Sequence, residues 1–381
     1  MSKVQSILKR TLKIILWVAL VFVLIFVLMA ILIQIPAIQN KIIHYVTSYV
    51  SNKTHTKIEI KNITISFPKS IVMKGLFLED LGKDTLLYAE KVKVNILFTD
   101  LLSNKIGVSY FALEDVNLKV NRIATDSLFN YNFLLTAFKS KTDQKKVVLP
   151  TKSKWTFSLD NVSLKNIRLH YDDKYGGMNV AAVLGKLDLK MDAIDFDKSI
   201  YSIDKLLIES INANVRMSKP ANVNEQKSNS VLPEILANKI QINNSTVNYG
   251  NSISKQSIIA VLNRFELKDG SVDLQKEIVT IDKLILSKSD IKVNTSDSKV
   301  LTNTAVVVPI TTESNWKVTV KSIDLDDNSL AYQVGNKPGI KNVFDANQLK
   351  YKHLTFVASN LNYSVDKTKV LIRKFSAIDQ N

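Results

Sequence analysis

Residues 187–206, LDLKMDAIDFDKSIYSIDKL, return without a gap as residues 265–284, FELKDGSVDLQKEIVTIDKL, so the same order of apolar, basic and acidic positions recurs after 78 residues. Upstream, Val162-x-Leu164 recurs at that offset as Ile240-x-Ile242, and again as Ile323-x-Leu325 after 83 further residues. Self-similarity at a fixed period indicates a repeat architecture, in which each unit buries its apolar side by stacking on the next unit.

Most of the chain alternates apolar and polar residues with a period of two. Residues 58–67 (IEIKNITISF) and 111–120 (FALEDVNLKV) are typical, and such alternation predicts strands with one apolar face. The alternation slips by one residue at Asn62 and Asp115, so we expect a bulge or a tight turn there. Helical spacing is rare after residue 52; residues 129–138 (FNYNFLLTAF) are the best candidate for a short helix.

Composition excludes several classes of protein. The chain has 381 residues, 51 Lys and Arg against 35 Asp and Glu, and no Cys. Disulfides, thiolate metal sites and Cys nucleophiles are therefore excluded. Only six of the basic residues are Arg, and base readout relies on bidentate Arg, so we expect no nucleic-acid partner. The positive balance fits either an anionic surface or a general Lys bias.

Residues 14–33 (IILWVALVFVLIFVLMAILI) carry no charge. A helix of this length covers about 30 Å, the thickness of a bilayer core. Four basic residues precede the segment and no acidic residue occurs before Glu59, which predicts a cytoplasmic N-terminus. The segment is longer than the core of a signal peptide, so we expect an uncleaved, single-pass anchor. Its residues include Ile14, Trp17, Phe22, Phe26 and Ile33.

Residues 36–52 follow the anchor with helical spacing of apolar side chains, for example Ile38, Ile42 and Val46. This pattern predicts a short amphipathic helix that either lies on the lipid surface or caps the first strands. The predicted segments of the whole chain are a basic tail (1–13), a transmembrane helix (14–35), the amphipathic helix (36–52), an N-terminal β region (53–145) and three β repeats (146–230, 231–304 and 305–381). The third repeat is expected to be a truncated copy.

Familiar catalytic and metal-binding patterns are missing. The sequence contains no H-E-x-x-H, G-x-S-x-G or phosphate-loop motif, so we predict no enzymatic activity, no cofactor and no metal. The pairs Asp172-Asp173 and Asp326-Asp327 resemble calcium ligands, but Asp is also common where strands end in turns. We interpret both pairs, and the turn at Gly176-Gly177, as structural.

An amphipathic sheet must cover its apolar side, and few helices are predicted to do so. Two arrangements remain open from the residues alone. The sheet closes on itself as a sandwich, or it curls into an open trough whose apolar interior receives a ligand. The second arrangement suits acyl chains, because Ile, Leu, Val and Phe would line it.

Several stretches resemble the AsmA-like superfamily, and within it the TamB proteins of the Bacteroidetes type. They are the basic start and single anchor, residues 35–40 (IPAIQN), 58–63 (IEIKNI), 84–89 (DTLLYA), 113–116 (LEDV) and 129–133 (FNYNF). The order of these features carries the resemblance, which covers roughly residues 8 to 215 and then the repeats. It implies a mainly β fold: an N-terminal transmembrane helix, then an elongated, repeat-built antiparallel β-sheet curled into a groove.

The resemblance further implies a location in the inner membrane, with the bulk of the chain in the periplasm, and phospholipid transport toward the outer membrane. The alternative that it implies is a scaffold for outer-membrane protein assembly with a partner β-barrel. We expect phospholipid acyl chains to contact the repeat-equivalent apolar positions. These are Val162, Leu164, Leu187, Leu189, Ile240, Ile242, Phe265, Leu267, Ile323, Leu325, Leu354 and Phe356.

Overall fold

The computed structural model describes most of the chain after residue 29. It covers residues 30–66, 70–125, 128–138, 156–219, 232–296, 315–335 and 344–380, and before them residues 16–18, 20–21, 24–25 and 27–28. The expected anchor residues Ile14, Phe22 and Phe26 lie outside the described residues.

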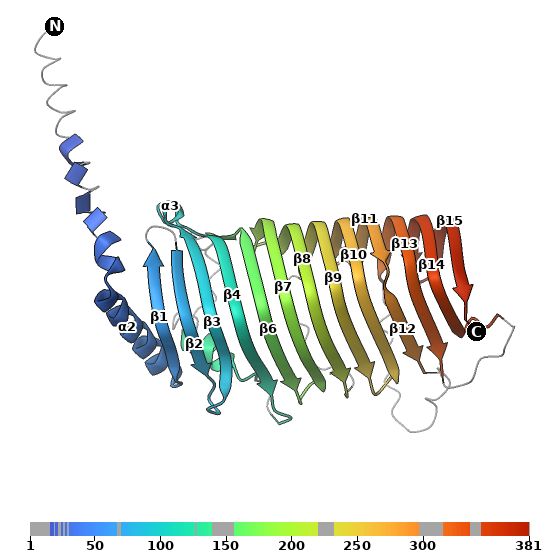
Figure 1. The fold of residues 1–381 in the computed structure, drawn as a ribbon, viewed down its shortest axis with the longest axis horizontal. Coiled ribbons are helices and arrows are strands. Elements are labelled where there is room, and N and C mark those ends of the chain that lie inside the picture. The colour runs from blue at the N-terminus through green and yellow to red at the C-terminus, as the bar shows by residue number, and fades with distance from the viewer. Residues whose placement is uncertain are drawn as a thin grey trace, which may run out of the picture.

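The described chain is dominated by one long sheet whose strands follow one another from β1 to β15 (Figure 1). The strands are β1 (Ile58–Ser66), β2 (Ser70–Glu79), β3 (Thr85–Leu97), β4 (Lys105–Arg122), β5 (Thr156–Leu159), β6 (Asn161–Asp173), β7 (Met178–Asp195), β8 (Ile200–Met217), β9 (Glu234–Asn251), β10 (Gln256–Asp273), β11 (Ile278–Ser287), β12 (Asp290–Thr295), β13 (Lys317–Val334), β14 (Gln348–Ser364) and β15 (Lys367–Asp379). The helices are α2 (Pro36–Thr54), α3 (Phe98–Leu101) and α4 (Asn132–Phe138).

Each strand makes its main tertiary contacts with its neighbours in this sheet. In the described part of the chain no second sheet lies against either face, and the contacts of α2 and α3 with the sheet are with β1 and β4. At about 4.8 Å per strand, the thirteen strands of the main path extend over about 58 Å. The described residues therefore form a long single layer, not a sandwich.

The predicted repeat is present in the strand boundaries. Strands β7 and β10 begin 78 residues apart, as do β8 and β11. Strands β9 and β13 begin and end 83 residues apart. From β6 onward the strands thus fall into groups of three positions in the sheet: β6–β8, β9–β11 and β13–β15. The short strands β5 and β12 lie next to β6 and β11 in the chain.

The sheet is mixed, and the expectation of a wholly antiparallel sheet was wrong. Pairing is parallel between β4 and β6, between β8 and β9, and between β11 and β13. For the last two of these pairs the reason is the odd number of strands in the groups β6–β8 and β9–β11, whereas β4–β6 follows four strands, β1–β4. After three antiparallel strands the chain leaves the sheet at the opposite strand ends from those where it entered. It then crosses back to the starting side before the next group begins. The first strand of that group is therefore parallel to the strand before it.

A line of kinks crosses the sheet where the sequence alternation slips. Glu90 and Asp115, on β3 and β4, both leave the pairing, which resumes without a register shift on either side. Asp115 has φ 53°, and aligned positions on later strands are also left-handed: Asn166, Ser210, Asn244, Asp327 and His353. At Asp115 the structure has, in place of the predicted bulge or tight turn, a kink that neighbouring strands share. Where neighbouring strands slip together, as β3 and β4 do, the apolar side chains stay on one face.

Asn166 is suited to this kink, because Asn tolerates positive φ and its Nδ2 donates to Asp115 Oδ1 at 2.9 Å. We expect Asn166→Val to lower the free energy of unfolding by about 2 kcal/mol, since a β-branched residue is strained in this conformation. Asn166→Gly keeps the conformation accessible and should cost less. Urea unfolding of the two variants measures the difference, and equal losses would contradict a role for the left-handed backbone.

Helix α2 contacts β1 and α4, which agrees with the capping alternative for residues 36–52. Its end is marked by His55 at φ 58°, whose N–H donates to Ser51 O. Tyr45 and Tyr49 on its outer side remain exposed. The short helix predicted at 129–138 is confirmed as α4, which begins three residues later, at Asn132.

Before α2, the described residues from Leu16 to Gln34 are helical, and most of their large apolar side chains are exposed. Leu16, Trp17 and Leu24 are more than 60% exposed, whereas Ile33 is half-buried. None of the helices in the described ranges is long and apolar enough to cross a membrane. Since residues within 14–33 lie outside those ranges, the anchor stays a prediction.

Candidate functional site

Two unbroken rows of apolar side chains cross the whole sheet on one face, which we call the apolar face. Paired residues of neighbouring strands place one side chain from each of the thirteen strands in each row. The first row is Ile65, Ile71, Val94, Phe111, Val162, Leu189, Leu206, Ile240, Leu267, Leu284, Ile323, Ala358 and Ile372; the second is Ile63, Met73, Val92, Leu113, Leu164, Leu187, Ile208, Ile242, Phe265, Leu286, Leu325, Phe356 and Phe375.

Eleven of the twelve predicted apolar positions lie in these two rows, and Leu354 does not. It pairs with Asn328 beyond a register shift at the kink and is buried. The copy of this segment on β14 therefore aligns with the two earlier copies two residues later than the sequence similarity indicates. Phe356 takes the place of Phe265, and Ala358 takes the place of Leu267.

Sequence reasoning missed the members of both rows on β8 and β11, namely Leu206, Ile208, Leu284 and Leu286. The alternation of these residues was visible, and Leu206 and Leu284 belong to the repeat itself. The register of the parallel strand pairs could not be read from the sequence. One such pair, β8 with β9, joins the first repeat to the second and places Leu206 beside Ile240.

The exposure of the two apolar rows is greatest at the β15 end of the sheet. Near β3 and β4, Ala89, Val92 and Val116 form a buried cluster, and Val92 is 4% exposed. Along the whole sheet most members of the rows are half-buried. On the last strand, Ile372 and Phe375 are 53% and 57% exposed. Exposed apolar area of this extent is unusual for a soluble surface and marks a binding site.

The opposite face carries ion pairs. Lys186 Nζ lies 2.8 Å from Asp188 Oδ2, and Lys190 Nζ lies 2.7 Å from Asp204 Oδ2. Glu266 sits beneath Lys239, Arg264 and Lys268. Burial would raise the pKa of Glu266, but hydrogen bonds from the basic side chains outweigh it and the pKa is lowered. This face is thus suited to water and the apolar face is not.

A buried ion pair joins the last residue of β4 to the last residue of β6. Arg122 Nε and Nη2 donate to Asp173 Oδ1 and Oδ2 at 2.8 and 2.5 Å. The guanidinium lies between the rings of Phe129 and Tyr175, 4.5 and 4.8 Å from their centroids. Bonding to Arg122 lowers the pKa of Asp173 although burial opposes it. Asp173 Oδ1 also accepts from Gly176 N–H in the predicted turn, so its role in the structure is that of a turn and ion-pair residue.

In the described ranges, no three His, Asp or Glu side chains come together in a way that would hold a metal ion. Asp327 of the second acidic pair lies at the kink, where its Oδ1 is 2.7 Å from His353 Nδ1. No known protein family matches the chain, and no curated protein is significantly similar to it.

Proposed function

We propose that this protein binds phospholipid acyl chains on the apolar face and passes lipid along it, tethered to a membrane by residues 14–35. The observation that carries the proposal is the pair of continuous apolar rows across thirteen strands, half-buried and without a second layer in the described part. A lipid that slides along such rows exchanges one apolar contact for an equivalent one, so movement meets no large barrier. The role of the residues is to shield acyl chains from water, and no catalytic step is involved.

The N-terminal residues support the tether. Side chains of the helical residues between Leu16 and Gln34 are apolar and exposed, which is favourable in lipid and costly in water. We place the anchor in the inner membrane and the sheet in the periplasm, in keeping with the resemblance to AsmA-like proteins and with the basic residues before the anchor.

The experiment that tests the proposal is mass spectrometry of lipids that co-purify with the full chain, combined with photo-crosslinking from Leu189 and Leu267. We expect phospholipid to co-purify and both positions to crosslink to it. A matched photo-crosslinker at Lys190, which follows Leu189 and faces the other side, should capture little lipid. Purified protein without phospholipid, or equal capture from both faces, would contradict the proposal.

One observation favours the second candidate, a scaffold for protein assembly. Strand β15 pairs only with β14, and its other edge has no partner among the described strands. Its exposed side chains include Leu371, Ile372 and Phe375, and an apolar edge of this length can accept a further strand. By contrast, α2 covers the β1 end of the sheet. If crosslinks from β15 capture protein strands while Leu189 and Leu267 capture no lipid, the scaffold function is supported instead.

A further inference from the structure

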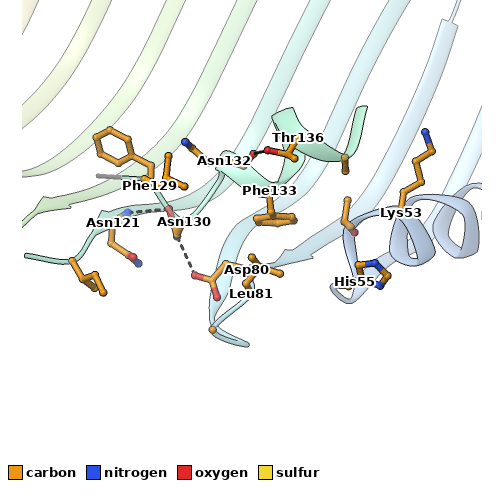
Figure 2. A pocket seen from close by; sticks show the side chains of 15 residues that line it. Lys53, His55, Asp80, Leu81, Asn121, Phe129, Asn130, Asn132, Phe133 and Thr136 are labelled. Carbon is orange, nitrogen blue, oxygen red and sulfur yellow. Dashed lines mark hydrogen bonds between the residues drawn. The ribbon is translucent and has the colours of Figure 1, made fainter. Parts of the chain in front are cut away.

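A separate cavity of about 640 Å³ lies beside the ends of the first strands, between the β2–β3 turn, the end of β4 and helices α2 and α4 (Figure 2). Four segments that are distant in sequence form it: the end of α2, the turn between β2 and β3, the end of β4, and the chain from Leu128 through α4. None of its lining residues belongs to the two apolar rows. Its volume falls within the range of small-molecule sites.

The walls of this cavity are mainly apolar. Leu81, Ile123 and Leu128 come from three of the four segments and are 64%, 55% and 56% exposed, yet all three border the same space. Phe133 and Ala137 of α4 complete the walls, and Figure 2 shows the Phe133 ring above Leu81 and Asp80. Convergence of exposed apolar side chains on one hollow indicates an apolar ligand.

The cavity is held in shape by hydrogen bonds around Asn130. Asn130 N–H donates to Asn121 O at 2.9 Å, and Asn121 N–H donates to Asn130 Oδ1 at 3.0 Å. Asn130 Nδ2 donates to Asp80 Oδ2 at 3.0 Å, and Asp80 Oδ1 accepts from Asp84 N–H. These bonds occupy the Asp80 carboxylate and fix three of the four segments, so a ligand meets a preformed site.

A cation borders the same cavity. Lys53, in the last turn of α2, has its Nζ 5.6 Å from the Tyr49 ring centroid and 5.5 Å from that of Phe138. Among the described residues, no carboxylate lies within ion-pair distance of Lys53. An ammonium held against aromatic rings and without an anionic partner is available to an anionic group of a ligand.

We propose that this cavity binds a single-chain anionic amphiphile, with the acyl chain against Leu81, Ile123 and Phe133 and the carboxylate at Lys53. The site is distinct from the apolar face and does not depend on lipid transport there. Its ligand class follows from an apolar cavity of limited volume with one cation beside it.

Photolabelling of the full chain in an amphipol with a diazirine-bearing palmitic acid tests this proposal. We expect labelled peptides from residues 120–138. Ala137→Trp, which fills the cavity, should reduce labelling about tenfold, a loss of roughly 1.4 kcal/mol in binding. Leu135→Trp is the matched control, because Leu135 lies on the same helix but does not line the cavity, and its labelling should match that of the unaltered protein.

Lys53→Gln should weaken labelling by the free acid several-fold and leave labelling by the methyl ester unchanged. If Ala137→Trp disturbs α4, Ile123→Glu at the end of β4 tests the same wall. Labelling confined to the strands of the apolar face, or undiminished in both cavity variants, would overturn the site. Equal loss with acid and ester in Lys53→Gln would overturn the assignment of Lys53 to the carboxylate.

Discussion

Leu206→Glu should abolish most lipid capture by the sheet while leaving the sheet folded. Leu206 lies between Leu189 and Ile240 in the first apolar row and is half-buried. A carboxylate there keeps its water in the lipid-free protein, so the cost to folding is small. An acyl chain bound on the row would desolvate that carboxylate, and desolvation costs several kcal/mol unless the carboxylate is paired. We expect at least a tenfold loss of bound phospholipid, or about 1.4 kcal/mol.

The matched control is the next residue. Leu207 is also a half-buried leucine on β8, but it pairs with Asp188 and Gln241 on the opposite face. Leu207→Glu should therefore leave lipid binding within about twofold of the unaltered protein. Phospholipid per protein is measured by mass spectrometry, and circular dichroism checks that both variants keep their strands. Similar losses of bound phospholipid in the two variants would show that lipid binding does not depend on the apolar face.

Leu189 and Leu267, which flank the same stretch of the row, should respond as Leu206 does. A row that conveys lipid is interrupted wherever one charge is placed, whereas an isolated pocket is affected only by nearby residues. Charges placed separately at these positions thus distinguish a continuous path from a local site.

The sequence predicted the strands and the apolar face well, because both depend on local alternation. The 78-residue offset of the quoted stretches reappears in the bounds of β7 and β10. The phase slip at Asp115 corresponds to a kink in the structure. These features are properties of single strands, and their physical cause is present in ten or twenty consecutive residues.

The order of the strands was not predicted, and their direction was predicted wrongly as antiparallel throughout, since both depend on pairs of residues far apart in the chain. Nothing near Leu206 or Ile240 indicates that they are parallel partners. Leu354 was misplaced because the pairing of β13 with β14 shifts register on both sides of it, and sequence similarity does not reveal such a shift. The cavity beside α4 was missed for the same reason, as its four segments meet only in the folded chain.

The ion pair of Arg122 and Asp173 should carry much of the stability of the junction between β4 and β6. It is the point where the N-terminal strands join the first repeat by parallel pairing. The two side chains are 11% and 5% exposed, and removing one partner of a buried ion pair is strongly destabilising. We expect Asp173→Asn to lower the free energy of opening of this junction by roughly 3 kcal/mol, measured by hydrogen exchange of the β4 and β6 amides.

The pH dependence gives the same prediction an independent measurement. Arg122 lowers the pKa of Asp173 below its unfolded value, so the pair stabilises the folded state above an unfolded pKa of about 3.9. That stability is lost as the pH falls through the lowered folded pKa. Asp173→Asn should remove this acid-dependent loss.

The control variant is Asp204→Asn, which breaks the exposed Lys190–Asp204 ion pair of similar distance. It should change the hydrogen-exchange rates of the β4 and β6 amides little, because water screens that pair. If both variants open the sheet equally, burial of the Arg122–Asp173 pair is not what stabilises the junction.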